Sequence, residues 1–236
     1  MRRSLILEEL RRDVSLAARQ IVRRPSFALP AIVTLALGVG AATAIFSAAD
    51  HILLRPLPFE DADRVVVLRE VDRSRSGAVT DVSAGNFLAW QERARVFGTM
   101  GLAEPFGVDL QSPEGVPESV RAWLVTRDFL PSLGVTPLLG RGFRDADVAP
   151  GAETVVILSH ASWQRRFGGD PGVVGRTIPM DTGAARVVGV LPRVPLWPGE
   201  REVLLPKVFL ERELDDRESR YMHVVARLAP GITLDE

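Results

Sequence analysis

The sequence predicts an α+β protein in which one N-terminal transmembrane helix precedes an external split βαβ domain with an inserted, mainly β subdomain. Residues 27–49 contain no charged side chain. Beyond them, short β-branched runs alternate with stretches whose apolar residues recur at helical spacing. Up to residue 135 their order is strand, helix, strand, strand and short helix, which is half of a split βαβ layout.

The uncharged stretch Phe27–Ala49 has 23 residues. At about 1.5 Å per residue it is long enough to cross a bilayer core of roughly 30 Å. The first 26 residues carry seven arginines and three acidic residues. Because Lys/Arg excess marks the cytoplasmic side, we expect a cytoplasmic N-terminus and an external main domain from about His51 onward. Ser47-Ala48-Ala49 offers an alternative signal-peptide cleavage site, but the apolar run exceeds the usual length of about 7–15 residues.

Residues 1–26 are interpreted as a cytoplasmic amphipathic helix. Its apolar stripe is Leu7, Leu10, Val14, Ala17 and Ile21. The helix either lies on membrane lipids of the inner leaflet, which the spacing favours, or couples to a cytoplasmic partner.

Small residues recur every four positions in the predicted transmembrane helix, at Ala36, Gly40, Ala44 and Ala48. This spacing lets a second helix approach closely. We therefore predict a helix-packing site within a larger bundle, although Ala and Gly are also common in membrane helices generally.

The external domain, residues 50–236, is divided into a first half (64–135), an inserted β subdomain (136–215) and the start of a second half (216–236). Strands are expected at Val65–Val71, Met100–Leu110, Glu118–Val125, Thr154–Leu158, Thr177–Asp181, Ala185–Val190, Val203–Leu205 and Tyr221–Leu228. Arg73–Thr80 and Gly140–Gly151 are expected to be loops.

Three helices are expected in this domain. One begins after an N-cap at Ser83 and ends near Arg95, one is a short helix capped by Thr126 and ended by Gly134, and one spans His160–Phe167 after Ser159. Their apolar faces place Phe87, Trp90, Trp163 and Phe167 in the core.

The last residues, Thr233 to Glu236, have the T-x-x-E form of a capping box. A helix is therefore expected to follow, and the chain is interpreted as C-terminally truncated. Three further apolar segments encoded after Glu236 would favour a membrane protein with several helices. A stop codon at that point would favour a single-pass protein.

No catalytic, cofactor-binding or metal-ligating set is predicted. The phosphate-loop pattern has no match, there is no cysteine, and His51, His160 and His223 do not have ligand spacing. The external part is mildly acidic, which argues against nucleic-acid binding. The chain is therefore expected not to be an enzyme.

Several motifs occur in an order that resembles one family. They are Arg23–Phe27, Leu35–Phe46, Leu53–Pro58, Leu133–Pro137, Gly140-Arg141, Trp163–Pro171, Gly175-Arg176, Val188–Pro192 and Arg227–Gly231. Together they resemble the periplasmic core domain of MacB-type ABC transporter permeases of the FtsX-like superfamily, in particular the duplicated orphan permease branch.

The resemblance implies a protein of the cell inner membrane with a periplasmic, porter-like domain and three more membrane helices. It also implies an ABC ATPase subunit at the cytoplasmic side, and either a permease homodimer or a second permease half. The expected function is a non-catalytic permease subunit that relays ATPase-driven motion to a substrate or partner protein. The alternatives are a single-pass membrane-anchored binding or regulatory module acting on envelope proteins, and a secreted enzyme released by cleavage.

Overall fold

The computed structural model describes residues 25–49, 61–72, 77–111, 117–149 and 151–233. The chain divides into two units, Met1–Pro56 and Leu57–Glu236. The predicted amphipathic helix of residues 1–26 lies almost entirely outside the described residues, so its prediction is not tested.

In the first unit, residues Pro25–Ala49 form the 25-residue helix α2. Two threonine hydroxyl groups donate hydrogen bonds to backbone carbonyls four residues earlier in the helix. Thr34 Oγ1 donates to the carbonyl of Pro30 at 3.0 Å, and Thr43 Oγ1 donates to the carbonyl of Val39 at 2.7 Å. Of the residues that the structure describes, none forms a helix with both the length and the apolar character needed to span a membrane. The helix is confirmed, and its transmembrane role stays a prediction.

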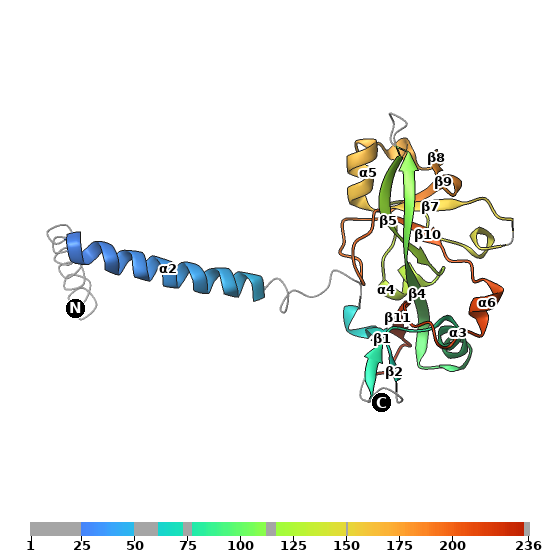
Figure 1. Cartoon of the computed structure of the whole chain (residues 1–236), viewed down its shortest axis with the longest axis horizontal. Helices are drawn as coiled ribbons and strands as arrows, with labels where there is room; N and C mark the ends of the chain where they lie inside the picture. Colours follow the sequence, from blue (N-terminus) through green and yellow to red (C-terminus); the bar gives the residue numbers. More distant parts are fainter. Residues whose placement is uncertain (1–24, 50–60, 73–76, 112–116, 150, 234–236) are drawn as a thin grey trace, which may run out of the picture. The chain divides into compact units, whose positions relative to one another are not determined.

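The second unit is built on a nine-stranded sheet in the order β1-β11-β4-β5-β10-β7-β9-β6, with β8 pairing to β4 and β9 (Figure 1). The strands are β1 (Val65–Leu68), β4 (Phe97–Gln111), β5 (Pro117–Val125), β6 (Leu139–Gly140), β7 (Val155–Leu158), β8 (Thr177–Met180), β9 (Gly183–Val190), β10 (Val203–Pro206) and β11 (His223–Leu228). A second sheet pairs β2 (Glu70–Asp72) with β3 (Ala78–Thr80).

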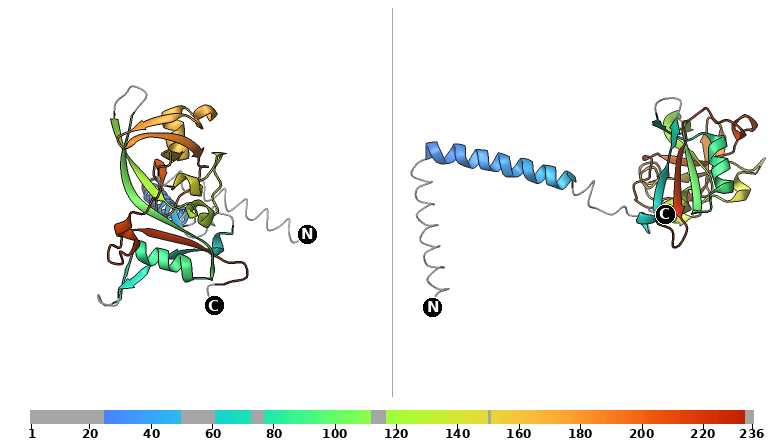
Figure 2. Two further views of the ribbon diagram at one scale, coloured as in Figure 1. Left: turned by 90° about the vertical axis from the view of Figure 1, so that its right-hand side faces the viewer. Right: turned by 90° about the horizontal axis from the view of Figure 1, so that it is seen from below.

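Strands β1, β11 and β4 form a split βαβ arrangement with helix α3, and the middle strand β11 comes from the residues assigned by the sequence to the second half. β11 is antiparallel to both β1 and β4, so β1 and β4 run parallel with β11 between them. Helix α3 (Ala84–Arg93) lies in the connection from β1 to β4 and covers one face of these strands (Figure 2). On β11, Val224 and Ala226 pack with the α3 cluster while Val225 packs on the opposite face. β11 is apolar on both faces because both are covered.

β4 has 15 residues and therefore spans about 50 Å at about 3.3 Å per residue. It pairs with β11 at its beginning and with β5 from Ala103 to Gln111. β5 in turn pairs with β10 in parallel, and β10 with β7. The sheet is thus continuous from the split βαβ part into segment 136–215, and the division at residues 135 and 215 stays a prediction.

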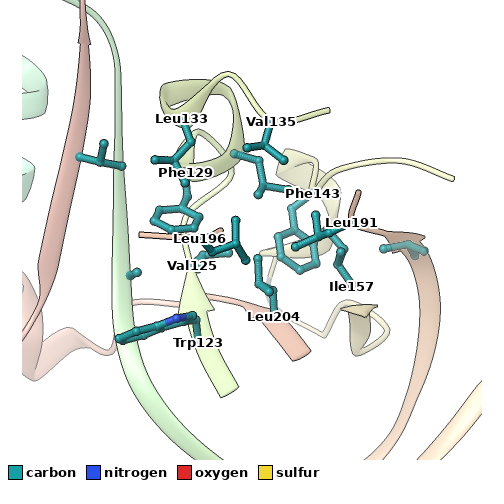
Figure 3. Packing of buried hydrophobic residues seen from close by; sticks show 14 of the residues in the cluster. Trp123, Val125, Phe129, Leu133, Val135, Phe143, Ile157, Leu191, Leu196 and Leu204 are labelled. Atoms are coloured by element: carbon teal, nitrogen blue, oxygen red, sulfur yellow. The ribbon is translucent and has the colours of Figure 1, made fainter. Parts of the chain in front are cut away.

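The short helix α4 (Phe129–Leu133) packs on the sheet face opposite α3, where its apolar side chains meet those of β5, β7 and β10 (Figure 3). A third cluster lies under α5 (His160–Phe167). The predicted core residues are confirmed: Phe87 and Trp163 are buried, and Trp90 and Phe167 are partly buried in the same clusters.

The predicted caps of α5 are confirmed. Ser159 Oγ accepts a hydrogen bond from the N–H of Ser162 at 3.1 Å, and Gly168 ends the helix at φ 59°. For α4, Gly134 is confirmed as the terminator at φ 71°, but the N-cap is Asp128. Thr126 does not cap the helix because its hydroxyl accepts from the N–H of Leu102 on β4.

One strand prediction and one loop prediction were wrong. The predicted strand Val65–Val71 is interrupted at Arg69, and its two parts, β1 and β2, belong to different sheets. The predicted loop Arg73–Thr80 contains β3, which pairs with β2, and Gly77, directly before β3, has a φ of 77°. Helix α6 (Glu211–Leu214) was not predicted, because its four residues carry little periodicity.

Gly101 on β4 is required by the close approach of α4. A Cβ at this position would lie 2.2 Å from the Cα of Phe129, whereas a Cβ at Gly107 on the same strand meets nothing within 4 Å. We expect Gly101→Ala to lower the free energy of unfolding by about 1–3 kcal/mol through overpacking. Gly107→Ala, the matched control, should change it by no more than about 0.5 kcal/mol. Chemical denaturation measures both; equal effects would contradict the described packing of α4 on β4.

Candidate functional site

The predicted helix-packing residues lie on α2. Ala36, Gly40 and Ala44 are exposed, and a Cβ at Gly40 meets nothing within 4 Å. The side chain of Ala48 lies outside the described residues. The spacing of four puts the three described residues along one side of the helix. Packing against a second helix stays a prediction.

A buried charge cluster, which we call the Lys207 cluster, consists of Lys207, Glu104, Glu213 and Tyr221. Lys207 follows β10, and its side chain is only 3% exposed. Its Nζ lies 2.6 Å from Glu104 Oε2 on β4 and 2.8 Å from Glu213 Oε1 on α6. Its backbone N–H donates to the carbonyl of Val125 on β5. One ammonium group therefore joins β4, the end of β10 and α6.

The charges of this cluster stabilise one another. Burial alone would lower the pKa of Lys207, but the adjacent Glu104 and Glu213 carboxylates raise it above its ordinary value. Burial would raise the pKa of Glu213, yet the N–H of Leu210 and the Lys207 ammonium bring it below its usual range. Burial and then the two carboxylates raise the pKa of Tyr221, so its hydroxyl stays neutral. These directions keep Lys207 charged, Glu213 ionised and Tyr221 neutral near neutral pH.

A second cluster joins the small sheet to α3. Arg220 donates to Glu70 at 2.7 Å and to Asp72 at 2.9 Å, both on β2. Glu70 Oε1 also accepts from the N–H and the hydroxyl of Ser83. Burial would raise the pKa of Glu70, but the Ser83 N–H and the further hydrogen bonds lower it. Ser83 is the N-cap of α3, as predicted, although its hydroxyl donates to Glu70 and makes no capping bond.

The described histidines are in aromatic contacts. His160 lies edge-on to Trp163 at 5.5 Å, and His223 lies edge-on to Trp123 and Trp197. Within the described ranges, no three or more His, Asp or Glu side chains are grouped so that they could hold a metal ion.

Comparison with known proteins connects this fold with a family. Residues 28–236 match the sequence model of the MacB-like periplasmic core domain. The chain belongs to this family. It is therefore related to the permease components of ABC transporters, which work with an ABC ATPase. Family membership also supports a membrane-associated protein with an extracellular domain. No curated protein sequence matches the chain.

Two solved structures show the same fold. A domain of a protein assigned as a permease, from Porphyromonas gingivalis, is 20% identical with a TM-score of 0.58, and the match covers 75% of this chain and 80% of that chain. The periplasmic region of MacB from Actinobacillus actinomycetemcomitans is 13% identical with a TM-score of 0.50, covering 72% and 77%. The MacB-like core domain of this chain thus shares its mixed α/β fold with that permease domain and with the periplasmic region of MacB.

Removing the Lys207 ammonium tests its structural role. Lys207→Met leaves the buried Glu213 and the partly buried Glu104 without their cation, and we expect the free energy of unfolding to fall by about 3–5 kcal/mol. The matched control is Arg186→Met, which breaks an ion pair with Glu153 whose side chains are 40% and 54% exposed. Because that pair is exposed to solvent, breaking it should change the free energy of unfolding little. Denaturant unfolding at neutral pH measures both variants, and a loss at Lys207 as small as that at Arg186 would refute the structural link.

Proposed function

We propose that this chain is a non-catalytic permease subunit of an ABC-type exporter or mechanotransmission system. In this proposal the external domain relays motion, driven by a cytoplasmic ABC ATPase, to a substrate or partner protein. The observation that carries the proposal is the family match over residues 28–236. The absence of a phosphate-loop motif from the sequence supports a role without ATP hydrolysis of its own.

The construction of the external domain supports a mechanical role. β4 takes part in both ends of the large sheet, since it pairs with β11, β5 and β8. The Lys207 cluster adds a link between β4, β10 and α6. Because the sheet is hydrogen-bonded along its whole width, a displacement at one end would move the other end as well.

In the proposal, α2 crosses the inner membrane with the N-terminus in the cytoplasm and the external domain in the periplasm. The row Ala36, Gly40, Ala44 and Ala48 then faces another permease helix, from a homodimer or a second permease half. The basic N-terminal region contacts lipid head groups and the ATPase side of the assembly. The porter-like halves and the inserted subdomain form one external domain that acts on the substrate or partner.

A single-pass membrane-anchored module that binds or regulates envelope proteins is the alternative function. The small-residue row favours the permease, because a lone anchor does not need close helix packing. The two functions differ in the partner expected at the cytoplasmic side.

The absence of cysteine from the chain makes the membrane orientation directly testable. Arg11→Cys reports on the N-terminal region, and Glu92→Cys reports on an exposed position of α3. In intact spheroplasts, a membrane-impermeant maleimide should label Glu92→Cys and should label Arg11→Cys only after permeabilisation. The wild-type chain, which has no thiol, is the control.

The same variants separate the two functions. A thiol-to-amine crosslinker on Arg11→Cys should capture an ABC ATPase if the chain is a permease subunit. Crosslinks to envelope proteins from Glu92→Cys, with no ATPase captured at Arg11→Cys, would instead favour the regulatory module. Labelling of Arg11→Cys in intact spheroplasts would contradict the proposed orientation for both.

A further inference from the structure

A cavity of about 560 Å³ opens at the carboxyl ends of the parallel strands β7 and β9. Three backbone hydrogen bonds bring its walls together: Leu191 donates to Leu158, Ser159 to Glu202, and Glu202 to Arg121, each at 2.9 Å. The first turn of α5 forms one side, and residues 191–196 form another. Crevices at the carboxyl ends of parallel strands are common ligand sites.

Three arginines line this cavity without carboxylate partners. In the part of the chain that the structure describes, none of Arg121, Arg193 and Arg201 forms an ion pair with an acidic side chain. Arg165, which also lines the cavity, is paired with Glu202. Arg121 and Arg193 are exposed at the cavity, so their guanidinium groups are accessible to a ligand.

Arg201 is held in place by the protein. Its guanidinium carbon lies 4.1 Å from the ring centre of Trp123, and its Nη1 donates to the carbonyl of Glu200 at 2.9 Å. The Trp123 Nε1 donates to the carbonyl of Gly199, which fixes the ring beneath it. Burial and then the charge of Arg121 lower the pKa of Arg201. An anion between these two cations would relieve their repulsion and form charge-assisted hydrogen bonds.

Two glutamates also line the cavity: Glu202, which is paired with Arg165 and Arg166, and the exposed Glu200. The stretch from residue 191 to residue 196 is mainly apolar. Leu191 and Leu196 are buried beside the arginines, and Pro192 and Val194 complete this side. The volume lies within the range of about 300–1,000 Å³ that is typical of small-molecule sites. A ligand that fills the cavity would therefore present an acidic group to the arginines and an apolar group to the leucines.

We propose that this cavity binds a small amphipathic anion, namely a phosphate or carboxylate group joined to a compact apolar body. The inference depends only on the external domain and holds whether or not the chain acts as a permease. Phosphate and carboxylate are the anions that guanidinium groups bind in bidentate geometry.

Isothermal titration calorimetry on the full chain in detergent tests this with phenyl phosphate as the probe. We expect saturable binding at one site per chain that weakens as the salt concentration rises. Arg121→Gln and Arg193→Gln should each raise the Kd at least fivefold. Because both side chains are exposed, these variants should keep the wild-type Tm. The control is Arg95→Gln, an exposed arginine beyond α3 that does not line the cavity, and it should leave the Kd unchanged.

Two matched probes define the ligand class. Inorganic phosphate should bind at least tenfold more weakly than phenyl phosphate, because it lacks the apolar group, and benzylamine should not bind. The proposal is overturned if phenyl phosphate does not bind or if benzylamine binds as tightly as phenyl phosphate. It is also overturned if Arg121→Gln, Arg193→Gln and the control Arg95→Gln have the same Kd for phenyl phosphate. If inorganic phosphate binds as tightly as phenyl phosphate, the apolar part of the ligand contributes nothing, and the proposal of an amphipathic ligand is overturned.

Discussion

The external domain depends on one long strand. β4 supplies hydrogen-bonding partners for β11, β5 and β8, and apolar side chains to the clusters on both faces of the sheet. Its alternation places Leu102 toward α3 and Ala103 toward α4. The same stretch of β4 contains Gly101, which α4 approaches closely, and Glu104, which forms an ion pair with Lys207. Helix packing, charge pairing and sheet pairing thus converge on a few consecutive residues, and we infer that the two ends of the sheet move as one body.

Elements with strong local signals could be predicted from the sequence, and those fixed by distant contacts could not. Helix α5 is bounded by Ser159 and Gly168, whose capping preferences act within a few residues, and both limits are confirmed. The break at Arg69 could not be predicted, because β-branched residues lie on both sides of it in Val65–Val71. Pairing assigns its two parts to different sheets: β1 pairs with β11, far along the chain, and β2 pairs with the neighbouring β3. The mixture of strands and helices was predictable because it depends on the order of local patterns rather than on their boundaries. The position of β11 between β1 and β4 was not, because pairing over more than a hundred residues leaves no local signal.

The charged clusters could not be predicted by motif. Lys207 lies far along the chain from Glu104, so no spacing rule connects them. One signal was available: Lys207 is the single lysine among 29 basic residues, in an otherwise apolar run. A compact ammonium can approach two buried carboxylates where a planar guanidinium does not fit as easily. The arginines of the cavity are likewise gathered from separate elements, and their lack of acidic partners is visible only once the strands are paired.

The most direct test of the central claim is the distance between the two ends of the sheet. Spin labels on the double variant Glu92→Cys/Gln164→Cys report on α3 and α5, and the chain has no other cysteine. Double electron–electron resonance on the full chain should give one narrow distance distribution if β4 and β5 join the two ends rigidly. A broad distribution, or two separate maxima, would show a flexible joint between the ends and contradict the claim that the external domain transmits motion as one body.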